Sequence, residues 1–121
     1  MSRETVEIVR WSIDALNRRD RDAASRYVDP VIDLDWSRFR GLEAGVGREE
    51  PAARGFWITP LEFIEAGDQV VVPNCTLLCG RDGIEAVVRS APVLTVRHGR
   101  IVGWTLYHEK AEALQALGLA E

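Results

Sequence analysis

Near the N-terminus the apolar residues recur at helical spacing. They follow one another at steps of three, four and three residues: Val6, Val9, Ile13 and Leu16. Side chains at these steps share one face of a helix. Ser2 suits the N-cap of that helix, and Glu4 complements the positive end of its first turn. A helix is therefore predicted from Ser2 up to the polar run at residues 17–20.

A second, shorter helix is predicted directly after that polar run. Asp20 suits its N-cap, and its apolar positions lie within residues 23–27. Pro30 ends it, because proline lacks the N–H that would continue the helical hydrogen bonding. Two helices joined by so short a connection are expected to pack as a hairpin.

The segment Val31–Trp36 alternates between apolar and acidic residues, which predicts a strand. Asp33 and Asp35 share one face of that strand, and the apolar residues at positions 32, 34 and 36 share the other. Three glycines between residues 41 and 47 then mark a loop. Residues 48–57 allow at most about two or three helical turns, because Pro51 is tolerated only in a first turn.

Beyond Pro60 the chain is predicted to form strands. These are residues 61–66, 70–79, 84–97 and 101–107, with turns at Gly67-Asp68, at residues 81–83 and at His98-Gly99. Pro92 interrupts the hydrogen bonding of the third strand. A terminal helix, apolar at positions 111, 114 and 117, ends at Gly118. This order predicts an α+β fold with a mostly antiparallel sheet and helices on one face.

The composition excludes several classes of protein. The 121 residues include 15 Lys and Arg against 19 Asp and Glu, a net charge of −4, with 46% hydrophobic residues. This describes one folded domain without a basic face, so nucleic acid is not an expected partner. No apolar run approaches the roughly 20 residues of a membrane helix, and no signal-peptide order is present. We expect a cytoplasmic protein without membrane contact.

The two cysteines do not suit a disulfide. Cys75 and Cys79 fall on one predicted strand, about 13 Å apart at roughly 3.3 Å per residue, whereas a disulfide needs Cα atoms within about 7 Å. With only two histidines elsewhere in the chain, the cysteines also fall short of a zinc site, and no metal is expected.

Three stretches resemble the SnoaL-like branch of the nuclear transport factor 2 superfamily: Ala15–Pro30, Glu62–Val72 and Val93–Leu119. The resemblance implies a single domain over residues 1–121, cone-shaped, with a strongly curved sheet wrapped round the N-terminal helix pair. It also implies a shortened third helix, a C-terminal helix and an apolar pocket open at one end. Family enzymes use carboxylates without any cofactor, and most members are homodimers through the outer sheet face.

The same resemblance singles out two carboxylates as catalytic. Asp35 matches the general-base aspartate of ketosteroid isomerases, and a desolvated carboxyl group there would work near neutral pH. Glu109 stands where SnoaL-like cyclases tend to carry an acidic residue. The alternatives are that Asp33 and Asp35 both face water or that one of them caps the turn at residues 37–38, and that Glu109 only complements the dipole of the terminal helix.

Aromatic and polar side chains are the candidates for substrate binding. Phe56 and Trp57 lie where the family's third helix closes the pocket mouth, and Trp11 belongs to the same aromatic set. Tyr107 and Asn74 are candidate donors to an oxyanion. For each of them an ordinary place in the core or in a dimer interface is the alternative.

Departures from the family pattern leave two functions open. Ser12 stands where the isomerases carry a tyrosine, and Ala91-Pro92 stands where relatives carry an aspartate or a histidine. The segment at residues 47–62 is shorter than the corresponding segment of family members. Ketosteroid isomerisation is thus disfavoured. One remaining function is a cofactor-free acid/base enzyme (cyclase, isomerase, dehydratase or epoxide hydrolase) acting on a small apolar or weakly acidic molecule. The other is a non-catalytic ligand-binding or dimerisation module with a degenerate pocket.

Overall fold

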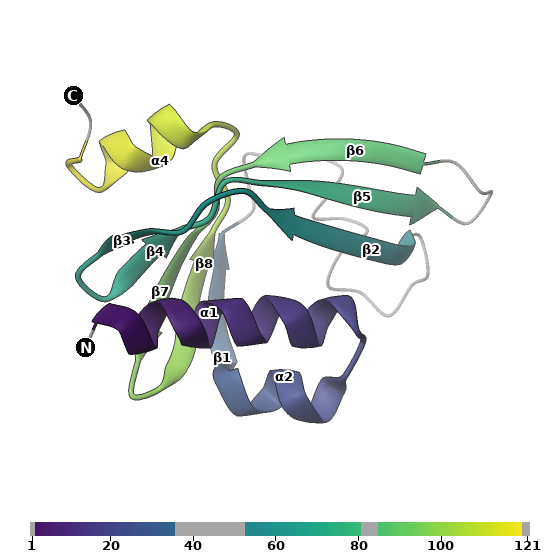
Figure 1. Ribbon diagram of the computed structural model, residues 1–121, viewed down its shortest axis with the longest axis horizontal. Coiled ribbons are helices and arrows are strands. Elements are labelled where there is room, and N and C mark those ends of the chain that lie inside the picture. Colours follow the sequence, from purple (N-terminus) through teal and green to yellow (C-terminus); the bar gives the residue numbers. More distant parts are fainter. Residues whose placement is uncertain (1, 36–52, 81–84, 120–121) are drawn as a thin grey trace.

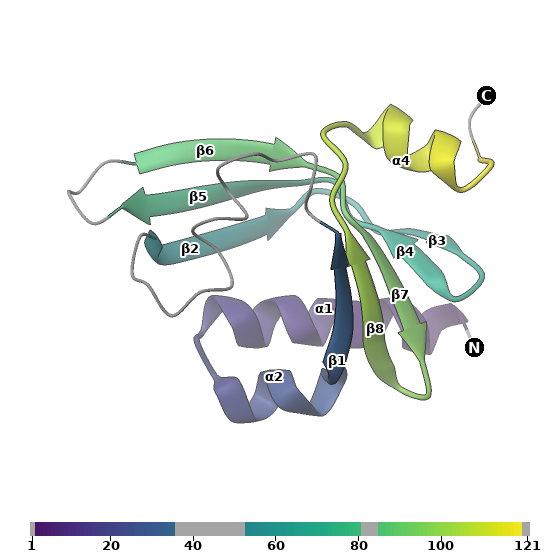
Figure 2. The same cartoon turned by 180° about the vertical axis from the view of Figure 1, so that it is seen from behind.

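A bent sheet with helices on both of its faces organises the chain (Figures 1 and 2). The structure is a computed structural model that describes residues 2–35, 53–80 and 85–119. Its elements are α1 (Ser2–Asn17), α2 (Arg21–Tyr27), β1 (Val28–Asp35), β2 (Ala53–Pro60), β3 (Ile64–Ala66), β4 (Gln69–Val71), β5 (Asn74–Gly80), β6 (Glu85–Ser90), β7 (Val93–Arg97), β8 (Arg100–Thr105) and α4 (Lys110–Ala116).

The sheet has two arms. One holds five strands in the order β1-β8-β7-β4-β3, and the other holds three in the order β2-β5-β6. The chain passes between the arms at Val72-Pro73 and at Ala91-Pro92, where the prolines supply no N–H to a strand ladder. The Val72 N–H donates to the Pro92 carbonyl at 3.0 Å and joins the two bends. Every neighbouring pair is antiparallel except β1 with β8, so the prediction of a mostly antiparallel sheet is confirmed.

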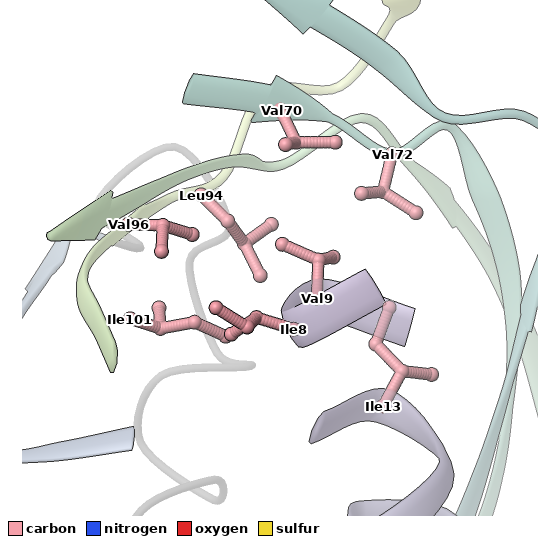
Figure 3. Packing of buried hydrophobic residues seen from close by; sticks show 8 residues of the cluster. All are labelled: Ile8, Val9, Ile13, Val70, Val72, Leu94, Val96 and Ile101. Atoms are coloured by element: carbon pink, nitrogen blue, oxygen red, sulfur yellow. The ribbon is translucent and has the colours of Figure 1, made fainter. Parts of the chain in front are cut away.

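Helix α1 packs into the concave side of the sheet (Figure 3). Its apolar stripe meets valine, leucine and isoleucine side chains from the five-stranded arm. The buried cluster is Ile8, Val9, Ile13, Val70, Val72, Leu94, Val96 and Ile101. Each such side chain contributes roughly 1.5–3 kcal/mol when fully buried. The spacing of apolar residues along α1, read from the sequence, therefore marks the side that faces the core.

Helix α4 packs on the convex side of the five-stranded arm, beside β4. Val71 and Val93 alternate with the core residues beside them and pack against Ala113 of this helix. The same alternation continues into β5, so the outer side of the three-stranded arm is continuous with the face under α4.

Helices α1, α2 and α4 and the described hairpin turns follow the predictions, although α1 already includes Ser2, the expected N-cap. The Asp20 Oδ1 accepts from the Ala23 N–H at 3.0 Å and caps α2. The turn between β7 and β8 has positive φ at both central residues, 54° at His98 and 77° at Gly99. This is the arrangement that two-residue hairpins favour. The α+β class is confirmed.

Several predicted boundaries are wrong. The helix expected over residues 48–57 is absent at residues 53–57, which belong to β2, and residues 48–52 lie outside the described part. Strand β1 begins at Val28 rather than Val31, because Val28 already has an extended backbone. The strands expected over 70–79 and 84–97 are each divided at a proline. The loop at 41–47 and the turn at 81–83 fall outside the described residues.

Candidate functional site

Asp35 ends strand β1 on the α4 side of the sheet. It stands opposite Thr105 of β8, and Thr105 stands opposite Val93 of β7. Paired residues point to the same face, and Val93 packs under α4. Asp33, two residues earlier, shares this face. The preceding residue, Leu34, aligns instead with Trp104, which packs against the core around α1.

The end of β1 is tied to the segment that leads into α4. The Leu106 N–H donates to the Asp35 carbonyl at 2.9 Å. Tyr107 follows and packs against the apolar cluster beneath α4. The exposed Glu109 is the N-cap residue of α4. Three predicted site residues, Asp35, Tyr107 and Glu109, therefore belong to one region of the fold.

The Glu112 side chain satisfies two backbone N–H groups at the start of α4. Its Oε1 accepts from the backbone N–H groups of His108 and Glu109 at 3.0 and 3.2 Å. A glutamate in the first turn that accepts from the N–H of the N-cap residue is typical of a capping box. Glu109 itself is exposed at the start of the helix.

The Asn74 side chain fastens the bend between the arms. It is buried, its amide donates to the Val72 carbonyl at 3.0 Å, and its Oδ1 accepts from the Thr76 hydroxyl at 2.8 Å. The Ser90 hydroxyl adds a longer bond of 3.4 Å. These contacts satisfy a buried polar group and give Asn74 a structural task.

Trp11 and Trp57, whose side chains the structure describes, lie in different parts of the fold. Trp11 lies against Tyr27 of α2, with ring centroids 5.7 Å apart. Trp57 lies on the outer side of the three-stranded arm, since its neighbour Ile58 packs against the core. Phe56 belongs to β2, but its side chain is outside the described part.

Asn17 joins α1 to β2 through a contact that the sequence does not indicate. Its amide donates to the Ile58 carbonyl at 2.8 Å, and its Oδ1 accepts from the Ile58 N–H at 2.7 Å. Asn17 thus pairs with edge strand β2 as a neighbouring strand would. In the sequence Asn17 marks only the end of a helix, because its partner Ile58 lies 41 residues away.

A cavity of about 680 Å³ opens beside the first turns of α1. The β3–β4 turn and the β7–β8 turn form its other walls. Ile8 and Val96 line it with apolar surface, whereas Glu4, Glu65 and Asp68 line it with carboxylates. Its volume is typical of small-molecule sites. None of the predicted catalytic or substrate-binding residues whose side chains the structure describes lines this cavity.

Two of these carboxylates differ in their surroundings. Asp68 is exposed and pairs with Arg97 at 3.2 Å. The Oε2 of Glu65 is buried without a hydrogen-bond partner. Alternation along β3 could have indicated which way Glu65 points, but the cavity itself arises from three chain segments that are distant in sequence.

Within residues 2–35, 53–80 and 85–119, no group of three or more His, Cys, Asp or Glu side chains is placed to hold a metal ion. No helix in that part is long and apolar enough to cross a membrane.

Solved structures share this architecture. A nuclear transport factor 2-like protein of unknown function from Burkholderia pseudomallei matches over 95% of this chain and 97% of its own, at 22% identity and a TM-score of 0.72. TerC, co-crystallised with polyporic acid, matches over 95% and 98%, at 17% identity and 0.71. An LEH-like epoxide hydrolase from M. tuberculosis matches over 96% and 90%, at 18% identity and 0.71. No protein-family model and no curated protein matches the sequence.

This chain therefore has the nuclear transport factor 2-like, cystatin-like fold, as the resemblance in its sequence indicates. At such low identities the likeness establishes the fold and leaves the activity open.

Proposed function

We propose that this protein is a SnoaL-like small-molecule-binding protein whose ligand enters the cavity beside the first turns of α1. The observation that carries the proposal is the cavity itself, about 680 Å³ with mixed apolar and carboxylate walls. Pockets that orient a ligand commonly combine apolar surface with a few polar groups. The fold agrees with this role, because TerC was crystallised with a small organic molecule.

A fragment titration followed by amide NMR tests the proposal. Bound fragments should shift the backbone amides of Thr5, Gly67 and Gly99 in a saturable way, since these residues line the cavity. Thr5→Trp should abolish the shifts by filling the space, whereas Asp14→Trp, at an exposed position of the same helix, should not. Fragments that shift no cavity amide, or that bind Thr5→Trp unchanged, would contradict the proposal.

The proposal includes a homodimer through the outer side of the three-stranded arm. Trp57, Leu77 and Val87 form one row across it, with 53%, 36% and 68% of their surface exposed. Contiguous exposed apolar surface often marks an interface. Sedimentation should give a dimer that Trp57→Glu dissociates, whereas Val31→Glu, an exposed apolar position on β1, leaves it intact. A monomeric native protein would contradict this part.

A second candidate function is cofactor-free acid/base catalysis at Asp35 and Glu109. It is favoured by the hydrogen bond between Leu106 and Asp35, which ties the end of β1 to the segment leading to Glu109. In epoxide hydration, Asp35 would take a proton from the attacking water, while Glu109 gives one to the oxygen of the breaking C–O bond. Tyr107 would orient the substrate.

Hydrolysis of cyclohexene oxide tests this second function. Asp35→Asn should lower the rate at least about a hundredfold, the scale of general-base catalysis, while Asp33→Asn on the same face is the matched control. A rate equal to that in buffer, or equal losses in both variants, would contradict it.

A further inference from the structure

Glu65 extends from β3 toward the concave side of the sheet. It stands opposite Val70 of β4, which in turn stands opposite Leu94 of β7, and both of these residues are fully buried in the core around α1. Because paired residues share a face, the Glu65 side chain leaves the sheet beside this core. It also lines the cavity. The Glu65 side chain therefore lies at the border between the core and the cavity, with its Oε2 atom covered.

One oxygen of the Glu65 carboxylate lacks a hydrogen-bond partner in the described part of the chain. Its Oε2 is buried, and no donor of that part bonds to it. By contrast, the neighbouring Glu62 and Asp68 each have a cationic partner, Lys110 and Arg97. A buried acceptor that lacks a bond is costly, and such groups in native proteins call for an explanation. One explanation is that a ligand supplies the missing hydrogen-bond partner.

The charge of the cavity identifies the kind of partner. Glu4 and Glu65 bring two carboxylates to its walls besides Asp68, which is paired with Arg97, and the one basic side chain among the described lining residues is His98. An anionic ligand would meet repulsion there, and a neutral one would leave Glu65 without a counter-ion. A cation would supply both a charge and hydrogen-bond donors.

The apolar part of the lining limits the cation further. Ile8 and Val96 face the same space, so a ligand that also carries a hydrocarbon chain gains by covering them. We propose that the cavity binds a small organic cation, a primary ammonium or guanidinium group on a short apolar chain, with Glu65 as its counter-ion. This inference rests on the proposed small-molecule function and specifies its ligand.

Three probes with the same hydrocarbon chain and different charge test the inference. Butylammonium, butanol and butyrate are titrated separately into the protein while the amides of Thr5, Gly67 and Gly99 are followed by NMR. Butylammonium should bind at least about tenfold more tightly than the other two probes. Glu65→Gln should weaken its binding by about tenfold or more. Glu62→Gln is the matched control, because it removes the same charge from an exposed pair outside the cavity lining.

The outcomes separate this inference from the function it rests on. Should butanol or butyrate bind at these amides as tightly as butylammonium, the cation preference is wrong and the cavity is still a ligand site. Butyrate also represents the weakly acidic ligand expected from the sequence. If none of the probes or fragments shifts the cavity amides, both proposals fall. Equal losses in Glu65→Gln and Glu62→Gln overturn the role of Glu65. If Glu65→Gln does not fold, the comparison of the three probes on the native protein decides.

Discussion

Replacing Asn17 by alanine should loosen the contact between α1 and β2. The substitution removes two hydrogen bonds, of 2.8 and 2.7 Å, and leaves both backbone groups of Ile58 without this partner. Each bond contributes about 1 kcal/mol net, and leaving a buried group unpaired costs somewhat more. Because Ile58 is only partly buried and water can replace some of the contact, we expect a total loss of about 2–3 kcal/mol.

Thermal and urea unfolding measure this loss. For a domain of this size, 2–3 kcal/mol corresponds to a Tm lowered by roughly 10 °C. Asp14→Ala is the control, since it removes an exposed ion pair with Arg18 one helical turn earlier and should leave Tm nearly unchanged. A loss below about 0.5 kcal/mol in Asn17→Ala, the scale of an ordinary surface substitution, would refute the role of Asn17 in holding β2.

Three further predictions concern stability. Leu94→Ala should cost about 2–5 kcal/mol in urea unfolding, because Leu94 is fully buried against α1. Gly99→Ala should cost about 1 kcal/mol, because φ is +77° at this position. The hydrogen bond from the Ala23 N–H holds the pKa of Asp20 below its usual 3.8. Its stabilisation is therefore complete above that value and is lost as the pH falls through the lowered pKa, so the Tm difference between native protein and Asp20→Ala should shrink below about pH 4.

Local patterns predicted the helices and hairpin turns because their causes lie within a few residues. Asp20 caps the helix that follows it directly, and His98 and Gly99 are themselves the two central residues of their turn. The division of the long strands at Pro73 and Pro92 depends instead on two arms that pair with different neighbours. The sequence marked Pro92 as a break, but it did not reveal that the sheet bends there.

The site was harder to predict because it depends on segments far apart in the chain. Alternation alone put Asp33 and Asp35 on one face, but only the pairing of β1 with β8 identifies it as the α4 side. The catalytic role of Asp35 stays a prediction. Nothing in the sequence singled out Glu65, because the cavity beside it is formed by α1 and two hairpin turns that are distant in sequence.

A crystal structure of the protein soaked with butylammonium would test the central claim most directly. Density for the probe in the cavity, with its nitrogen about 2.8 Å from a Glu65 carboxylate oxygen, is the predicted result. A probe found only elsewhere, for instance beside Asp35, while the space at the start of α1 holds nothing but water, would contradict it.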